Sequence, residues 1–235
     1  MHQLTPERQF ADLLRADPAR PFVTYYDEAS GERSELSAKS LANWVAKTHH
    51  LLGDELGLGV GDTALLALPA HWISVPIVLG CLTAGLELTT SGDADVAFVS
   101  EDTASAAGQV VDVYAIAAGN AALGLRDDAP AGVQDYVAAV RPQPDAWAGV
   151  QLVAGPGDPC LPGLTRGETV ERASAAGLPE HARLLTTRAA FGPPDWVDVL
   201  FAPLAVQGSV VIVRNCPDES VLERRAAQER VTARA

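Results

Sequence analysis

Residues 63–86 carry no formal charge, and this stretch constrains the fold more than any other feature of the sequence. It is long enough to cross a bilayer as a single helix. Two prolines interrupt it, acidic residues border both ends, and no lysine or arginine cluster lies nearby to set an orientation. We therefore reject a membrane span and expect a buried strand at 63–68, a turn, and a buried helix at 72–84 that ends at Gly85.

The rest of the chain alternates between patterns typical of strands and of helices. Helices are predicted to open at Thr5 and Ser37, both of which can cap free amides. The other predicted strands are 22–27, 33–36, 86–90, 95–99, 110–115, 149–154 and 209–214, and the other helices are 132–140, 166–176, 195–206 and 219–234. This alternation predicts an α/β fold, a layered and largely parallel sheet flanked by helices. We expect one α/β domain over 1–235, with a weak division into two lobes near 141–149 left open.

The charge balance excludes some classes of partner. Thirty acidic and seventeen basic residues give a net charge of −13, which repels phosphate backbones and anionic lipids. We expect no nucleic acid and no membrane partner. The three cysteines show neither a disulfide framework nor a metal-binding spacing, so no metal site is predicted. Without a secretory pattern at the N-terminus, the expected location is the cytoplasm.

Four short segments in order resemble a known family. They are LSAKSL at 36–41, LGVGD at 58–62, PAHW at 69–72 and LTAGLEL at 82–88, with a weaker match in APL at 202–204 and GSVVIV at 208–213. The series is similar to the N-terminal part of the AMP-binding enzymes, the superfamily of acyl-CoA synthetases, adenylation domains and luciferases. The resemblance implies a short branch with the fold of the front half of the acyl-CoA synthetase large domain.

The family's ATP-binding loop, of the form [ST]-G-T-T-G-x-P-K-G, has no good counterpart. Glycine amides and a lysine hold the phosphates in such a loop. The corresponding segment here, 153–163, contains three prolines that lack N–H groups, together with Asp158, which would repel phosphate. No lysine follows Lys47. The family's adenine motif, ribose-binding aspartate and catalytic lysine also have no counterpart, so the resemblance implies a truncated domain without cofactor, and ATP or AMP binding is doubtful.

Candidate ligand-binding residues follow the predicted strands. His71, Thr89, Thr90 and Ser100 lie at the carboxyl ends of strands, where open α/β sheets bind ligands. The alternative is that His71 packs on Trp72 and that the hydroxyl groups cap turns. We assign no catalytic residue.

Two further residues have alternative interpretations. Arg166 lies in a predicted capping box and could contact an anion, although a solvated side chain is the preferred reading. Cys160 lies in an apparently exposed loop and could be a reactive thiol, although a structural role is preferred because no cation lies near it in the sequence.

Three hypotheses follow for the function. The preferred one is a non-adenylating binding or accessory module, with an acyl or nucleotide ligand or a full-length ligase as partner. The second is an enzyme with altered chemistry in the same crevice, which would use His71 and the hydroxyl groups at the strand ends. The third is a structural homo-oligomer, because a strand at 209–214 on the edge of the sheet would favour pairing in a homodimer.

Overall fold

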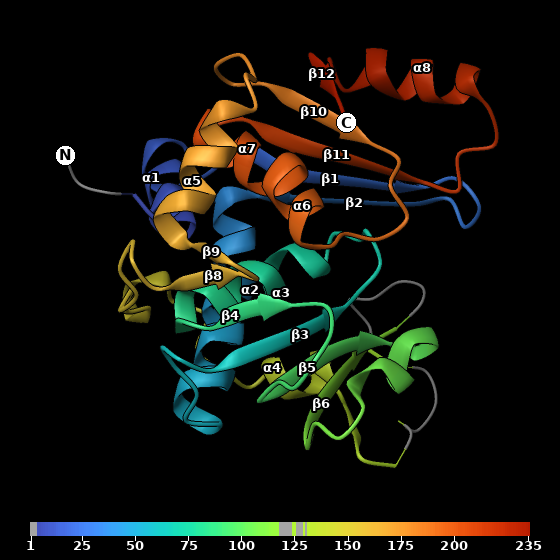
Figure 1. The fold of residues 1–235 in the computed structure, drawn as a ribbon. Helices are drawn as coiled ribbons and strands as arrows, with labels where there is room; N and C mark the ends of the chain where they lie inside the picture. Colours follow the sequence, from blue (N-terminus) through green and yellow to red (C-terminus); the bar gives the residue numbers. More distant parts are fainter. Residues whose placement is uncertain (1–3, 118–123, 126–128, 130) are drawn as a thin grey trace.

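The computed structural model describes residues 4–117, 124–125, 129 and 131–235, and it contains two five-stranded sheets with helices between them (Figure 1). Both sheets are largely parallel, which confirms the predicted α/β class. The single sheet expected from the sequence is replaced by two, which we call sheet A and sheet B.

Sheet A is built from the two ends of the chain. Its order is β12-β10-β11-β1-β2, and only β2 runs antiparallel to its neighbour. The bounds are β1 Pro21–Asp27, β2 Glu32–Ser37, β10 Arg183–Thr186, β11 Ser209–Arg214 and β12 Ala233–Arg234.

Sheet B comes from the middle of the chain and is entirely parallel, in the order β4-β3-β5-β6-β7. Its strands are β3 Thr63–Ala67, β4 Glu87–Thr89, β5 Val96–Ser100, β6 Asp112–Ile116 and β7 Val133–Asp135. A small antiparallel ribbon, β8 Pro159–Leu161 and β9 Leu164–Thr165, follows it in the chain.

Helices fill the space between the two sheets and cover their outer faces (Figure 1). The α-helices are α1 Pro6–Ala16, α2 Ala38–His50, α3 Ser74–Ala84, α4 Tyr136–Val140, α5 Arg166–Ala175, α6 Pro193–Trp196, α7 Ala202–Ala205 and α8 Glu219–Gln228. Short 3₁₀ or π-helical turns are η1 Leu51–Glu55, η2 Glu101–Ala107, η4 Trp147–Gly149 and η5 Val197–Phe201. Helix α8 covers the outer face of sheet A, and η2 packs on the outer face of sheet B.

The layering follows from strands that are apolar on both faces. In β5, Val96 and Phe98 join the central core between the sheets, whereas Ala97 and Val99 join a smaller cluster on the far side. Strand β11 divides its valines and isoleucine in the same way. Such unbroken apolar runs are expected of parallel strands covered on both faces.

The charge-free stretch folds as predicted, into β3 and the wholly buried helix α3. Gly85 ends α3 with φ of 103°, a left-handed conformation that glycine adopts without strain. None of the described helices is long and apolar enough to span a bilayer.

The structure differs from the predicted elements in several places. The first residues of the helix predicted at 132–140 form strand β7, and only Tyr136–Val140 are helical. Residues 149–154 form no strand, because η4 turns the chain there and Val153 is 62% exposed. The predicted helix at 219–234 ends at Gln228, and two of its last residues form β12.

Strand β10 was not predicted. It pairs with β11, so β11 is a central strand and the edge predicted for it is wrong. The stated reason for a homodimer therefore fails, and the oligomeric state stays a prediction, as does the domain division.

Candidate functional site

The predicted ligand-binding residues lie at or just beyond the carboxyl ends of sheet B strands. Thr89 is the last residue of β4 and Ser100 is the last residue of β5, and these two strands flank β3. Thr90 is exposed directly after β4, and His71 follows β3 by one short turn. Parallel pairing brings these strand ends to one edge of the sheet, as the sequence suggested.

The two buried hydroxyl groups bond within their own turns. Thr89 Oγ1 donates to the Ser91 carbonyl at 2.8 Å. Ser100 and Thr103 form a capping box at the start of η2, and their hydroxyl oxygens lie 3.0 Å apart. Turn and cap bonds of this kind occupy side chains that could otherwise face a ligand. A ligand-binding role for these residues stays a prediction.

His71 is buried between the two sheets. Its Nδ1 accepts a hydrogen bond from the Ile73 amide at 3.2 Å, which places the proton of the neutral ring on Nε2. Nε2 lies 3.8 Å from Glu32 Oε1 on β2, and the ring centroid lies 4.2 Å from that of Tyr25 on β1. The nearby His71 is the largest cause of a lowered pKa at Glu32. His71 therefore connects the loop after β3 with sheet A.

The segment that corresponds to the family's phosphate loop is bonded to itself. The Gly155 amide donates to the Asp158 carboxylate at 2.7 Å, and the Asp158 amide donates to the Gly155 carbonyl at 3.2 Å. The Pro156 carbonyl accepts from the Gly167 amide at 2.8 Å, which ties the turn to α5. The Gly155 N–H group therefore already donates to a carboxylate, and it would have to break this bond in order to bind a phosphate.

The predictions of a solvated Arg166 and of an exposed loop at Cys160 are wrong, whereas the structural role preferred for Cys160 agrees with its burial. Arg166 is fully buried, pairs with the buried Glu7 and donates to two carbonyl groups, so it is not a solvated arginine. Cys160 is also fully buried, because β8 packs its side chain inward, and burial raises the pKa of its thiol to about 12. A protonated, inaccessible thiol is not reactive.

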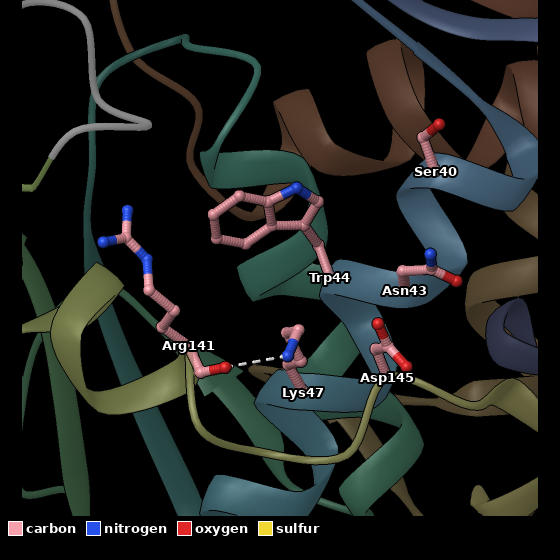
Figure 2. Close-up of a pocket in the computed structure, with 6 residues that line it drawn as sticks. All are labelled: Ser40, Asn43, Trp44, Lys47, Arg141 and Asp145. Carbon is pink, nitrogen blue, oxygen red and sulfur yellow. Dashed lines mark hydrogen bonds between the residues drawn. The ribbon is translucent and has the colours of Figure 1, made fainter.

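A cavity of about 320 Å³ lies between α2 and the loop that follows α4 (Figure 2). Four of its lining residues belong to one face of α2, and two belong to the loop. They are Ser40, Asn43, Trp44, Lys47, Arg141 and Asp145. None of the four residues predicted at the strand ends lines this cavity.

Lys47 fixes the loop side of the cavity. Its ammonium group donates to the carbonyl oxygens of Arg141, at 2.9 Å, and Gln143, at 2.6 Å. The Asn43 amide nitrogen, in its hydrogen-bonded orientation, donates to the carbonyl of Asp145 at 3.3 Å. Two α2 side chains thus hold the loop at a defined distance from the helix.

Sequence reasoning missed this cavity because its two walls are far apart in the chain. One signal was present. The protein has only two lysines, and one of them lies on the same helix face as Trp44, Asn43 and Ser40. Among the described residues, no group of three or more histidine, cysteine or acidic side chains is placed to hold a metal ion.

No established protein-family profile matches the chain. A Mycobacterium tuberculosis protein described as a TIGR03089 family protein is 41% identical over 233 residues, which cover 94% of this chain and 93% of that protein. The chain belongs to the TIGR03089 family. Its sequence similarity thus extends over nearly the whole length of that relative.

Solved structures show what fold the TIGR03089 chain adopts. A Brucella canis acyl-CoA synthetase matches 98% of the chain with a TM-score of 0.77 and 14% identity, and the nonribosomal peptide synthetase FmoA3 matches 97% with a TM-score of 0.69 and 20% identity. The chain covers 47% of the first protein and 25% of the second, so it spans about half the length of that acyl-CoA synthetase. These matches confirm the acyl-CoA synthetase-like fold expected from the sequence motifs.

Proposed function

We propose that this protein is a non-adenylating binding or accessory module built on the acyl-CoA synthetase fold. Its partner would be an acyl or nucleotide ligand, or a full-length ligase. The fold provides sheet ends and helix faces that can hold a small molecule, whereas the chain offers no phosphate loop of the family's kind at 153–163.

The closed turn at 155–158 carries this proposal. In a phosphate loop, backbone amides point at the anion and a cation lies beside it. Here the Gly155 amide is bonded to Asp158, and Pro156 and Pro159 have no N–H group to offer. Asp158 gives this turn a negative formal charge. A triphosphate at this turn would displace an internal bond and face a carboxylate.

The charge beside the strand ends supports the same reading. Glu101 and Asp102 are exposed and directly follow Ser100 at the end of β5. Their carboxylates favour a neutral or singly charged ligand at this edge over a polyphosphate.

The three cysteines are free thiols, which supports a reducing compartment such as the cytoplasm.

The experiment uses the full chain. Calorimetric titration with ATP, AMP and a non-hydrolysable acyl-adenylate mimic is combined with an ATP–pyrophosphate exchange assay in the presence of a panel of carboxylic acids. We expect no ATP–pyrophosphate exchange. We also expect the protein to bind one of these ligands or a purified ligase from the same cytoplasm. Exchange above the protein-free background, or the absence of any binder, would overturn the proposal.

A further inference from the structure

The α2 cavity, which is the cavity between α2 and the loop after α4, has a mostly polar lining. Its volume of about 320 Å³ is near the lower end for ligand cavities, which range from about 300 to 1,000 Å³. The α2 residues of the lining follow the i, i+3, i+4, i+7 spacing that places side chains on one helix face. The cavity therefore suits a compact, polar ligand and has one rigid wall.

The positively charged residues of the cavity are already engaged within the protein. The Lys47 ammonium group donates to two carbonyl groups of the loop, and Arg141 has a further interaction of its own. Figure 2 shows the Arg141 guanidinium group directed away from the Lys47 ammonium group. We therefore assign neither cation to a ligand. An anionic ligand would also lie near Asp145 in a protein whose net charge is −13, so a neutral ligand is favoured.

Three other lining residues keep polar atoms that have no partner in the part of the chain that the structure describes. The Asn43 amide nitrogen, in its hydrogen-bonded orientation, donates to the carbonyls of Lys39 and Asp145, so its amide oxygen remains an acceptor. Ser40 accepts from the Ser37 hydroxyl group, which leaves its own hydroxyl proton to donate. The Asp145 carboxylate pairs with no cation among the described residues and remains a second acceptor.

Trp44 adds a flat apolar surface and a second donor to the same wall. Its ring is partly exposed, and its centroid lies 5.7 Å from that of Trp72 and 6.4 Å from that of Tyr136, so two aromatic neighbours fix its orientation. The Trp72 indole N–H group donates to Glu32 at 3.1 Å, whereas that of Trp44 donates to none of the described residues. The wall therefore combines an aromatic surface with two donors and two acceptors.

A ring that carries several hydroxyl groups matches this combination. Each hydroxyl group both donates and accepts, so the groups around one ring can donate to the two acceptors of the wall and accept from its two donors. The C–H bonds on one face of a sugar ring form an apolar surface that packs on an aromatic ring. A wholly apolar ligand would leave the polar atoms without partners, which costs free energy. A flat heteroaromatic ligand carries fewer groups that both donate and accept.

We propose that the α2 cavity binds a small neutral sugar, with one face of its pyranose ring on Trp44. Its hydroxyl groups bond to Ser40, Asn43 and Asp145, while Lys47 holds the loop that carries Asp145 beside the helix. This inference goes beyond the proposed function, because such a ligand has neither a carboxylate that can be adenylated nor a phosphate. It adds a binding site away from the predicted strand-end residues.

The probes are the methyl glycosides of glucose, galactose and mannose, which differ in the orientation of single hydroxyl groups. Each is titrated into the full chain, and the Trp44 indole N–H signal, assigned with a Trp44→Phe variant, reports the location by NMR. Tetrahydropyran-2-methanol has the same ring with one hydroxyl group, and nicotinamide is a flat neutral comparison. Asp145→Asn and Ser40→Ala each remove one proposed contact. The exposed Asp93→Asn and Ser174→Ala are the matched controls.

We expect at least one glycoside to bind in the millimolar range and to shift the Trp44 signal, while the signal of Trp196, which lies in α6, stays in place. Binding should be about tenfold weaker to Asp145→Asn, about fivefold weaker to Ser40→Ala, and unchanged to both controls. An unshifted Trp44 signal with all three glycosides, equal binding to Asp145→Asn, or equal binding of tetrahydropyran-2-methanol or nicotinamide would overturn the inference. None of these results changes the outcome of the pyrophosphate exchange assay, which tests the proposed function separately.

Discussion

Glu7 and Arg166 form an ion pair in which both side chains are completely buried, with Glu7 Oε2 2.9 Å from Arg166 Nη1. The arginine also donates to the carbonyl oxygens of Leu82 and Leu86, each at 3.0 Å. One guanidinium group therefore joins α1, α5, the last turn of α3 and the residue before β4. Removal of either partner would leave a charge in an apolar interior.

Arg166→Met should destabilise the protein by about 3–5 kcal/mol, because Glu7 would remain buried without its partner. Adding Glu7→Leu should recover part of this loss. Urea unfolding of both variants measures the difference. Arg172→Met changes an exposed arginine on the same helix and should leave stability within about 0.5 kcal/mol of wild type. A double variant less stable than Arg166→Met alone would contradict this account.

Acid should weaken the attachment of the C-terminal end of α8 to sheet A. Burial acts to raise the pKa of Glu229, but hydrogen bonds from Tyr26 and Arg183 outweigh it and hold the pKa below the usual 4.5. A lowered pKa gives stability that is present above 4.5 and is lost as pH falls through the folded value.

Glu229→Gln should therefore lose about 2 kcal/mol at neutral pH and show a smaller stability difference than wild type between neutral pH and about pH 3. Urea unfolding at several pH values measures both effects. The exposed Glu171→Gln serves as the control. An equal pH dependence in wild type and Glu229→Gln would exclude this role.

Gly80→Ala should destabilise the contact between α2 and α3. A Cβ at this position would overlap the Thr48 side chain, which is held by hydrogen bonds to the Trp44 carbonyl and the Tyr136 hydroxyl. Alanine improves helix propensity by about 1 kcal/mol, but overpacking costs about 1–3 kcal/mol and should dominate. Thermal unfolding tests this, with Gly157→Ala, whose Cβ meets open space, as the control. A melting temperature at or above wild type would be the contrary result.

Lys47→Met should loosen the loop that forms one wall of the cavity. The amides of Arg141 and Gln143 bond to carbonyl groups in α4, and Lys47 holds the carbonyls of the same two residues. Loss of a charge-assisted anchor should speed hydrogen exchange at these amides by at least about tenfold. Lys39→Met changes the chain's other lysine, which is exposed, and should leave exchange unchanged. Similar exchange in the two variants would argue against Lys47 as the anchor.

Helices and strands that are specified by residues close together in the sequence were predictable. Ser37 caps α2 by accepting from the Ser40 amide, and Thr165 with Glu168 forms the predicted capping box at α5. The charge-free stretch was also interpreted correctly as β3 and α3, because apolar runs of these lengths, divided by a proline turn, match buried elements without reference to the rest of the chain.

Features set by distant partners were not predictable. Strand β10 is four residues long and is a strand only because β11 and β12 pair with it. The burial of Arg166 depends on Glu7, which lies far earlier in the sequence, in α1. The cavity depends on hydrogen bonds from Lys47 to residues about ninety positions later. Local sequence patterns carry no information about contacts between distant residues. The site was therefore predicted at the strand ends from residue types alone.

The position of β11 between β1 and β10 determines the order in which the chain can fold as it leaves the ribosome. Sheet B needs no residue beyond β7, so its strands can pair while much of the chain is still being synthesised. The hairpin of β1 and β2 is synthesised before the other strands. It stays without its neighbour the longest, because β11, which pairs with β1, begins only at Ser209. Until then β1 exposes an apolar, unpaired edge. During synthesis the apolar edge of β1 therefore stays unpaired until β11 has been made.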